Sequence, residues 1–308
     1  MHLVTDPADL RPAHYGAAAA LGNFDGIHPG HQTVIAAAHA AANPAAPLKA
    51  VIAFEPHPRQ YFRPDDPPFR LTSLHGKARL LQELGTDLFI ALTFDKALAE
   101  TSAEDFAHRI LGQELKVGHV AVGSDFRFGH RRTGDAEFLQ KAGAAAGYGV
   151  TVVDHASPST YIRPPIRKGD VVRANTRLGR AWSIDGVVVK GAQRGRQIGF
   201  PTINVPLGNF VRPRFGVYAV TVTYIDGGQD RTVAGVANLG VRPTFGGGDA
   251  GLEAYLFDFD GDLYGVHVDV ALLDFIRPEL SFDGLDALKA QIAADTHTAR
   301  RIHAARSA

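Results

Sequence analysis

Apolar and polar positions follow one period in the first half of the chain and another in the second. In residues 14–155, short apolar runs alternate with segments whose apolar residues recur at helical spacing. The apolar runs predict strands at 17–21, 50–53, 88–92, 119–122 and 150–153. The helical segments lie near 32–42, 73–84, 103–114 and 134–146. Strand–helix alternation is typical of a Rossmann-like α/β domain with a parallel sheet, in which ligands bind beyond the carboxyl ends of the strands.

From about residue 184 the period becomes two, which is the period of half-buried strands. Strands are predicted at 184–189, 216–224, 232–236, 252–257 and 267–275. Asp226-Gly227-Gly228 and Asp260-Gly261-Asp262 predict hairpin turns between them. A small antiparallel β-barrel is expected because closure removes exposed sheet edges, with an amphipathic C-terminal helix at 285–303. The expected domains are therefore 1–175 and 176–308.

Composition excludes several classes of protein. Lys plus Arg and Asp plus Glu both number 32, so no net charge favours a nucleic-acid or membrane partner. Cysteine is absent, which removes disulfides, thiol nucleophiles and cysteine metal sites. We find neither an apolar signal segment nor a run long enough for a membrane span, and we expect a cytoplasmic protein. The basic stretch at 160–180 lacks interleaved aromatics, so a solvated connecting helix is preferred to an RNA-binding element.

The richest chemistry lies at 22–31, between the first predicted strand and the first helix. The segment reads Gly22-Asn23-Phe24-Asp25-Gly26-Ile27-His28-Pro29-Gly30-His31. Two imidazoles and free backbone N–H groups at a helix N-terminus stabilise negative charge, and the glycines permit a close approach of phosphate. The spacing predicts that His28 and His31 donate to an ATP phosphate during adenylyl transfer. A metal-binding pair or a simple helix cap remains the alternative.

Six motifs, in order and spread over nearly the whole chain, resemble those of the bacterial bifunctional riboflavin kinase/FAD synthetase family. The first is Gly22-x-Phe24-Asp25-Gly26-x-His28-x-Gly30-His31-Gln32. The others are Phe54-Glu55-Pro56-His57-Pro58, Val122 to Gly129, Gly199-Phe200-Pro201-Thr202-x-Asn204 and Gly235 to Thr244, followed by Leu256-Phe257-Asp258-Phe259. The resemblance implies two activities: ATP-dependent phosphorylation of riboflavin to FMN, and transfer of AMP from ATP to FMN to give FAD and diphosphate.

In the first half, the resemblance implies that the 22–31 segment binds ATP through Gly22, Phe24, Asp25, Gly26 and both histidines. Arg127 offers a planar donor fork to phosphate, and Asp125 is expected to accept from a flavin or ribose hydroxyl; a local Asp–Arg pair is the alternative. Ser159, Thr160 and Arg163 resemble the family's second nucleotide motif, although Pro158 replaces its first serine and Pro164-Pro165 follow the arginine. A helix is therefore expected to begin at these prolines or later. Phe54, His57 and Pro58 are expected to shape a flavin pocket, or else simply to form a strand-end turn.

In the second half, the resemblance implies that Gly199, Thr202 and Asn204 bind ATP, with Thr202 and Asn204 also holding Mg²⁺. Oxygen ligands suit this hard cation, and a glycine-rich surface loop with a Thr/Asn turn is the alternative. The family position of Glu253 identifies it as the general base for the 5′-hydroxyl of riboflavin, whereas a lone strand glutamate is often only solvated. Arg277 and Glu279 are expected to border the flavin.

The prediction is therefore a two-domain enzyme with riboflavin, FMN, FAD and ATP as its small-molecule substrates and products. Three alternatives stay open at this stage. The chain is a riboflavin kinase whose α/β half has lost activity, or a flavin-binding module without turnover, or a nucleotidyltransferase for another small phosphate compound. A test with FMN and ATP separates the first alternative, since it forms no FAD.

Overall fold

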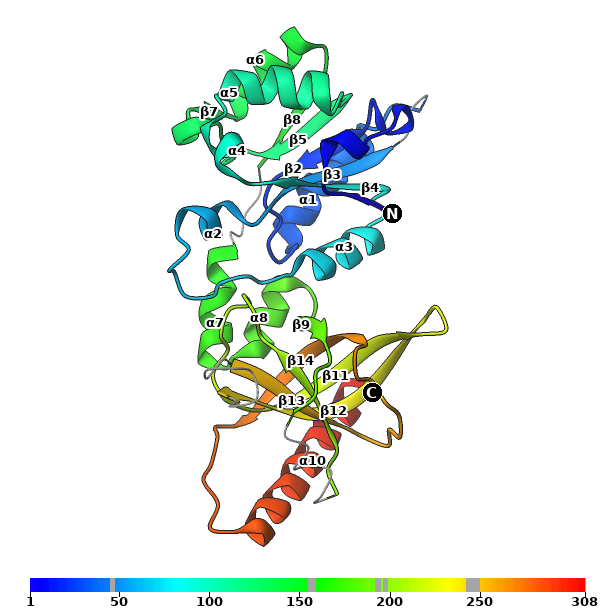
Figure 1. Cartoon of the computed structure of the whole chain (residues 1–308), viewed down its shortest axis with the longest axis vertical. Coiled ribbons are helices and arrows are strands. Elements are labelled where there is room, and N and C mark those ends of the chain that lie inside the picture. Colours follow the sequence, from blue (N-terminus) through cyan, green and yellow to red (C-terminus); the bar gives the residue numbers. More distant parts are fainter. Residues whose placement is uncertain (45–47, 155–158, 192–194, 196–198, 242–249, 308) are drawn as a thin grey trace. The chain divides into compact units, whose positions relative to one another are not determined.

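The computed structural model describes residues 1–44, 48–154, 159–191, 195, 199–241 and 250–307, and it divides into two compact units (Figure 1). The first unit comprises Met1–Asp66 and Lys77–Pro158. The second comprises Pro67–Gly76 and Ser159–Ala308. A short segment of the first half of the sequence, Pro67–Gly76, is thus part of the second unit, and we call it the inserted segment. The expected boundary between residues 175 and 176 concerns activities and stays a prediction.

The first unit is built on a six-stranded parallel sheet, as the alternation of strands and helices predicts. Its strand order is β1-β4-β3-β2-β5-β8, and every neighbouring pair is parallel. The strands are β1 (His2–Val4), β2 (Ala18–Leu21), β3 (Lys49–Glu55), β4 (Leu88–Thr93), β5 (His119–Gly123) and β8 (Gly149–Val153). Nearly continuous apolar runs form these strands because both faces of the sheet are covered.

The connections of this unit include all four predicted helical segments. The α-helices are α1 (Pro29–Ala40), α2 (Pro58–Phe62), α3 (Leu74–Glu83), α4 (Lys96–Glu100), α5 (Ala103–Asp105) and α6 (Ala136–Ala146), and α5 continues into the π-helix η3 (Phe106–Glu114). The short elements are η1 (Pro7–Asp9), η2 (Pro12–His14), η4 (His130–Arg132) and the strand pair β6 (Arg127–Phe128) and β7 (Gly134–Asp135). The sequence pattern missed β1, α2, α4 and the β6–β7 pair, since elements of two to five residues show almost no periodicity.

The second unit contains a six-stranded antiparallel sheet that curls into a half-barrel, with a long helix packed on it (Figure 1). Its strand order is β10-β13-β12-β11-β14-β9. The strands are β9 (Trp182–Val187), β10 (Thr202–Pro206), β11 (Gly216–Asp226), β12 (Gln229–Val241), β13 (Ala250–Leu256) and β14 (His267–Arg277). The helix α10 (Leu285–Ser307) packs against β11, β12 and β14. A single bridge between Val189 and Asn204 joins the chain after β9 to the opposite edge strand.

One of the two predicted hairpins is confirmed and the other is wrong. Gly227 and Gly228, both with positive φ, turn β11 directly into β12, where Asp226 pairs with Gln229. Asp260-Gly261-Asp262 does not make a hairpin, because β13 and β14 are separated in the sheet by β12 and β11. Asp258, just before it, instead accepts two hydrogen bonds from Arg300 on α10, so this connection helps to anchor the helix. A turn-like sequence therefore identified a connection but not its partner strands.

Three short helices precede the half-barrel: η5 (Ser159–Tyr161), α7 (Arg163–Lys168) and α8 (Val171–Leu178). The helix α7 begins one residue before the predicted start and carries its prolines in the first turn, where a missing N–H costs nothing. The predicted features at Pro158, Arg196, Ile198 and Arg242 to Thr244 lie outside the described residues.

The inserted segment is joined to the second unit by backbone and side-chain hydrogen bonds. The Arg70 N–H donates to the carbonyl of Asn209 (3.0 Å), and the Arg70 carbonyl accepts from Val211 (2.8 Å). The indole N–H of the fully buried Trp182 donates to the Leu71 carbonyl (3.0 Å). The Ser73 hydroxyl donates to the buried carboxylate of Asp185 on β9. These contacts make the inserted segment part of the half-barrel's core, which no periodicity of its own predicts.

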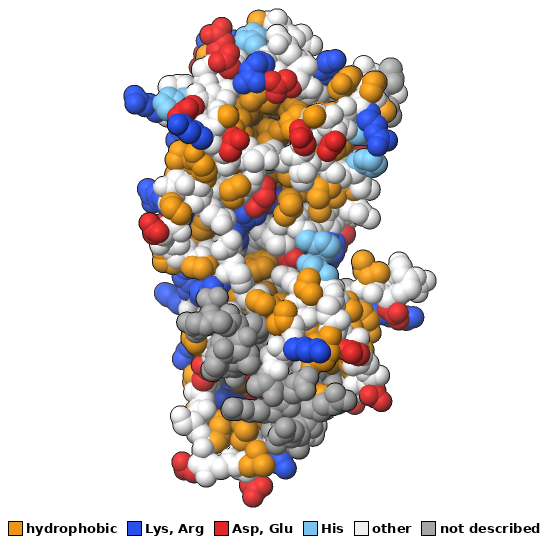
Figure 2. Space-filling view, viewed as in Figure 1, with side chains coloured by type: hydrophobic (Ala, Val, Ile, Leu, Met, Phe, Trp, Pro, Cys, Tyr) orange, Lys and Arg blue, Asp and Glu red, His pale blue; other side chains and the backbone are white. Residues whose placement is uncertain are grey.

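Charge distribution agrees with the balanced composition. On the face drawn in Figure 2, Lys and Arg side chains are interspersed with Asp and Glu side chains. Among the described residues, no helix is both long and apolar enough to cross a membrane.

Candidate functional site

The segment 22–31, which we call the signature loop, connects the carboxyl end of β2 to α1. Its backbone takes unusual conformations at Phe24 (φ 48°) and Ile27 (φ 40°), which are left-handed values that non-glycine residues rarely adopt. Phe24, Asp25 and Ile27 are nevertheless buried, so packing holds the strained backbone in place. The loop thus has a fixed shape at the edge of the sheet where ligands of parallel sheets bind.

His28 and His31 lie together at the N-terminus of α1, as their spacing predicts. His28 is the N-cap, and its Nδ1 accepts the backbone N–H of His31 (3.3 Å). Because Nδ1 is an acceptor, the neutral His28 ring carries its proton on Nε2. The two rings stack with their centroids 3.6 Å apart, and His28 is only 1% exposed. The pair presents donors beside the positive end of the α1 dipole, which is an arrangement that stabilises phosphate charge.

Lys77 is a residue of this site that the sequence analysis missed. Its side chain is 1% exposed, and its ammonium donates to the carbonyl of Asn23 in the signature loop (2.9 Å). A buried lysine beside the signature loop adds a hydrogen-bond donor that supports the loop's backbone. A lysine within a predicted helix gives no sequence signal for this contact, because Lys77 and Asn23 are 54 positions apart.

The predicted flavin-binding residues lie at the carboxyl end of β3, with Phe54 in the strand and His57 and Pro58 just after it. Phe54 is 8% exposed and packs against Phe94 and Phe106, so it is a core side chain. His57 caps α2, its Nδ1 accepting from the backbone N–H of Arg59 (3.1 Å), and Pro58 is the first residue of that helix.

An aromatic surface lies beside them. The rings of Tyr61, Phe62 and Phe94 contact one another edge to face at centroid distances of 5.2–5.6 Å. Phe62 is 62% exposed. We call these three residues the aromatic group; its signal in the sequence was the Tyr-Phe pair soon after Pro58.

Asp125 and Arg127 follow β5 and are exposed. The Arg127 guanidinium donates to the carbonyl of Phe126 (3.1 Å), and among the described residues it forms no ion pair with Asp125. The alternative of a local Asp–Arg pair therefore receives no support, and Arg127 points a cation into solvent at the ligand edge.

Ser159, Thr160 and Arg163 belong to the second unit and not to the unit of the signature loop. The Arg163 Nε donates to the carbonyl of Phe69 in the inserted segment (2.8 Å), and its guanidinium lies over the Phe69 ring. Thr160 is exposed. The structure groups this predicted nucleotide motif with the inserted segment.

In the second unit, three polar side chains form a row across neighbouring strands. Glu253 on β13 is paired directly with Asn204 on β10 and with Asn238 on β12. Residues paired in this way point to the same face of an antiparallel sheet, and each neighbour lies about 4.8 Å away. We call Asn204, Glu253 and Asn238 the polar row. The alternate residues, including Val205, Leu252, Ala254, Ala237 and Leu239, face the other way and form the half-barrel core.

Thr202 joins the same face two residues before Asn204, as the predicted ATP and metal site requires. Glycines bring the backbone close to both residues. A Cβ on Gly191 would lie 2.6 Å from the Asn204 amide, and one on Gly195 would lie 2.3 Å from the Phe200 carbonyl. Gly199 has φ +90°, which side-chain-bearing residues rarely adopt. Gly191 and Gly195 therefore lie close to the sheet face on the β10 side of Glu253.

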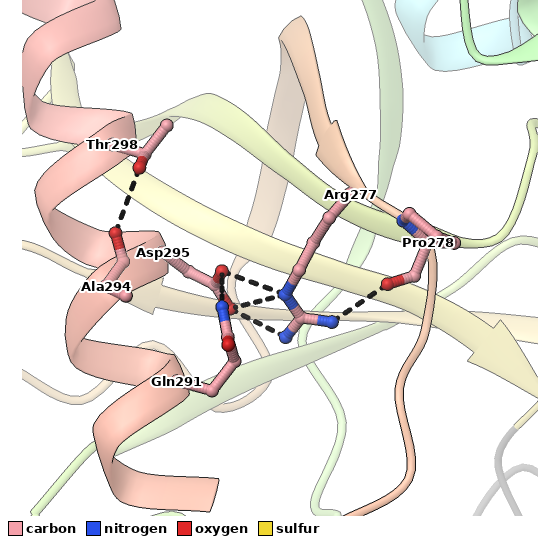
Figure 3. Close-up of polar contacts among 6 residues, drawn as sticks. All are labelled: Arg277, Pro278, Gln291, Ala294, Asp295 and Thr298. Atoms are coloured by element: carbon pink, nitrogen blue, oxygen red, sulfur yellow. Dashed lines mark hydrogen bonds and ion pairs between the residues drawn. The ribbon is translucent and has the colours of Figure 1, made fainter.

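Arg277 ends β14, and its guanidinium is engaged by α10 (Figure 3). Nε and Nη2 donate to the Asp295 carboxylate at 2.7–3.1 Å, and Nη1 donates to the Pro278 carbonyl. Gln291 donates to the same carboxylate (2.9 Å). Both ionic side chains are largely buried. Arg277 thus fixes α10 on the sheet, while Glu279 lies exposed just beyond it; a flavin contact for either residue stays a prediction.

Comparison with known proteins divides the chain between two family profiles. The family profile described as FAD synthetase matches residues 10–161, and the profile described as riboflavin kinase matches residues 178–303. Bifunctional riboflavin kinase/FMN adenylyltransferases of Escherichia coli K12 and Pseudomonas fluorescens are each 41% identical to the chain, covering 92% and 99% of it and 92% and 98% of themselves. A Streptococcus pneumoniae crystal structure described as a macrolide-efflux protein superposes with a TM-score of 0.79 at 31% identity, over 97% of this chain and 98% of that one.

The fold and these matches define a two-activity, ATP-using transferase of flavin metabolism. The chain belongs to the bifunctional riboflavin kinase/FMN adenylyltransferase family. It phosphorylates riboflavin to FMN and adenylylates FMN to FAD, so the predicted pair of activities is confirmed. The three alternative functions are set aside by this result.

Proposed function

We propose that each unit carries one of the two activities, with the signature loop as the adenylyltransferase centre and the polar row as the kinase centre. The observation that supports this division is that His28 and His31 lie in one compact unit, whereas Thr202, Asn204 and Glu253 share one sheet face in the other. The proposed functional domains remain 1–175 and 176–308, with the inserted segment packed into the second unit.

At the signature loop, an oxygen of the FMN phosphate attacks the α-phosphorus of ATP, and the bond to diphosphate breaks. Negative charge grows on the transferring and leaving oxygens during this step. His28, His31 and the first N–H groups of α1 donate to that charge, and Gly22, Phe24, Asp25 and Gly26 shape the pocket for ATP. Arg127 contacts phosphate from solvent, and Asp125 accepts from a hydroxyl. The aromatic group, with Phe54, His57 and Pro58 beneath it, stacks against the flavin ring.

At the polar row, the 5′-oxygen of riboflavin attacks the γ-phosphorus of ATP, and ADP leaves. Glu253 accepts the proton of that hydroxyl as the new P–O bond forms. Thr202 and Asn204 fit Mg²⁺, since they offer neutral oxygens and the buried Asn204 Oδ1 has no partner among the described residues. The cation supplies charge neutralisation to the ATP phosphates. Gly199 lets the backbone approach ATP at this centre, whereas Ser159, Thr160 and Arg163 stay proposed as nucleotide-binding residues of the adenylyltransferase.

The substrates of the shown activities are riboflavin, FMN and ATP, and FAD is the product. No nucleic-acid or membrane partner is proposed, and the interspersed surface charges support that view. An ATP-consuming step supports a cytoplasmic location for the enzyme.

Two substitutions test the division of labour. His28→Ala is expected to lower FAD formation from FMN and ATP about 10²–10³-fold, because charge-stabilising donors contribute on that order. Glu253→Gln is expected to lower FMN formation from riboflavin about 10²–10⁴-fold, the usual contribution of a general base. Each variant retains the other activity, measured by chromatographic separation of the flavins.

His39→Ala on the same helix and Asp226→Asn at the β11–β12 turn serve as matched controls and retain both activities. If either His28→Ala or Glu253→Gln abolishes both reactions in folded protein, the two-centre proposal is wrong.

A further inference from the structure

Asn238 lies beside the proposed base, yet neither the motifs nor the two reactions have given it a role. It occupies β12 directly opposite Glu253, on the side away from Asn204. On the next strand the row continues as Val217, which belongs to an apolar cluster with Val236, Leu273 and Ala299 of α10. Asn238 is therefore the last polar residue on this side of the row before the surface becomes apolar.

The side-chain oxygen of Asn238 is buried, and no described residue donates to it. A buried amide oxygen without a donor carries a desolvation cost, which a water, an ion or a ligand can remove by supplying a partner. Asn204 on the opposite side of Glu253 has the same property. The proposed base thus stands between two unsatisfied amide oxygens.

The two sides of Glu253 are not equivalent. Gly191 and Gly195 approach the sheet face on the β10 side, next to Asn204 and Thr202, so that side suits the phosphates of ATP. Attacking and leaving oxygens lie roughly in line across a transferring phosphoryl group. The acceptor alcohol must therefore reach Glu253 from the other side, which is the side of Asn238.

We infer that Asn238 is a specificity-determining residue of the kinase, whose amide oxygen accepts a hydrogen bond from the ribityl hydroxyl next to the one that is phosphorylated. The inference rests on the proposed placement of the kinase centre around Glu253. A bond to the neighbouring hydroxyl fixes the rotation of the terminal ribityl carbon and holds the 5′-oxygen between Glu253 and the γ-phosphorus. The site thereby selects an open-chain polyol over a simple alcohol.

The direct test compares Asn238→Leu, which removes the acceptor at similar volume, with Gln229→Leu, which makes the same type of change at the exposed start of the same strand. For Asn238→Leu we expect kcat/KM for riboflavin to fall about 10-fold or more, since a hydroxyl loses its buried partner. Gln229→Leu leaves it unchanged. FAD formation from supplied FMN stays normal in both variants and reports that the chain is folded.

Comparing two substrates in both the wild type and the variant distinguishes a contact with the ligand from a structural effect. Wild-type enzyme is expected to prefer riboflavin to 4′-deoxyriboflavin by about the same factor, and Asn238→Leu is expected to lose that preference. Asn238→Asp, which keeps the acceptor oxygen, retains the preference even if its rate falls, and it serves as the second variant if Asn238→Leu does not fold.

An unchanged preference in Asn238→Leu overturns the inference. Recovery of Asn238→Leu at raised Mg²⁺ concentration also overturns it, in favour of a cation ligand. If Glu253→Gln keeps full activity while Asn238→Leu still loses the preference for riboflavin over 4′-deoxyriboflavin, only the assignment of Glu253 as the base is wrong. Failure of the proposed base and failure of the Asn238 inference are therefore distinguishable.

Discussion

The two units place their chemistry in different ways. In the first unit the candidate residues sit on loops at the carboxyl edge of a parallel sheet, and their positions depend on the strained backbone of the signature loop. In the second unit they stand on neighbouring antiparallel strands, and their positions depend on strand register. A loop site is thus sensitive to local backbone changes, whereas a strand-face site is sensitive to anything that shifts or loosens the sheet.

The same contrast appears in what holds each site in place. The signature loop is supported locally, by the cap of α1 and by Lys77. The polar row lies on a sheet whose outer face is covered by α10, which is attached through Arg277–Asp295 and Arg300–Asp258. Disrupting the helix attachment should therefore damage the second unit while leaving the first intact.

The largest effect is expected from Arg277→Ala. It leaves the buried Asp295 carboxylate without its cation, which typically costs about 3–5 kcal/mol of unfolding free energy. The exposed pair Arg231–Asp226 is the control, and Arg231→Ala is expected to cost about 0–1 kcal/mol. Urea unfolding followed by tryptophan fluorescence measures the second unit, since the single Trp182 lies there. Equal losses in both variants contradict a structural role for Arg277.

An intermediate, acid-specific effect is expected from Asp185→Asn. Burial alone raises the pKa of Asp185, but hydrogen bonds from His267 and Ser73 outweigh it and hold the pKa below its ordinary value of 3.8. The lowered pKa adds stability that is present above pH 3.8 and is lost as pH falls through the folded-state pKa. Asp185→Asn is expected to lower the free energy of unfolding by up to about 1.5–3 kcal/mol at neutral pH. The stability of the variant should also fall less steeply than that of the wild type as the pH is lowered.

The measurement is the unfolding midpoint of the second unit between pH 2 and 7, with exposed Asp230→Asn as the control. An acid limb as steep as that of the wild type shows that other carboxylates control it.

The smallest effect is expected from Tyr148→Phe in the first unit. The phenol donates to the carbonyl of Ala107 (3.1 Å), and burial raises its pKa from 10.0 to about 12. The raised pKa adds to the free energy of unfolding below pH 10. This stabilisation is lost as pH rises through 12, because the phenol of the unfolded chain ionises first. The substitution is expected to cost about 0.5–1.5 kcal/mol at neutral pH and to flatten the alkaline limb of that unit.

Tyr218→Phe is the counterpart in the second unit, where burial also raises the pKa of the phenol. Hydrogen exchange of each unit from pH 8 to 11 separates the two variants. If Tyr148→Phe changes the alkaline stability of the second unit, or Tyr218→Phe changes that of the first, the assignment of each phenol's effect to its own unit is wrong.

Much of the fold could be predicted because its elements are periodic. The five predicted strands of the parallel sheet and the long strands β11, β12 and β14 all carry clear apolar patterns. A strand was expected to follow the glycine-rich segment at Thr202, and β10 confirms it, although Pro201 and Pro206 obscure its alternation and left its bounds undefined. The sequence could not show that Asp260 to Asp262 joins strands that never pair, because pairing is settled by the whole sheet.

Among site residues, the sequence analysis identified those that lie within motifs and missed those whose contacts join segments far apart in the sequence. His28 and His31 are three positions apart, so their meeting follows from helix geometry. Lys77 and the aromatic group were missed because their contacts connect separate segments. Asn238 lies inside a recognised motif, but its relation to Glu253 appears only once the register of β12 and β13 is known.

The inserted segment also bears on how the chain is made and divided. Ser73 and its partner Asp185 are separated by 112 positions, so Ser73 leaves the ribosome long before the strand that binds it has been synthesised. A fragment that starts at residue 176 lacks the carbonyl that receives the Trp182 indole N–H and the hydroxyl that reaches Asp185. A kinase fragment that starts at residue 176 would therefore have an incomplete core, and a stable fragment must also include the inserted segment Pro67–Gly76.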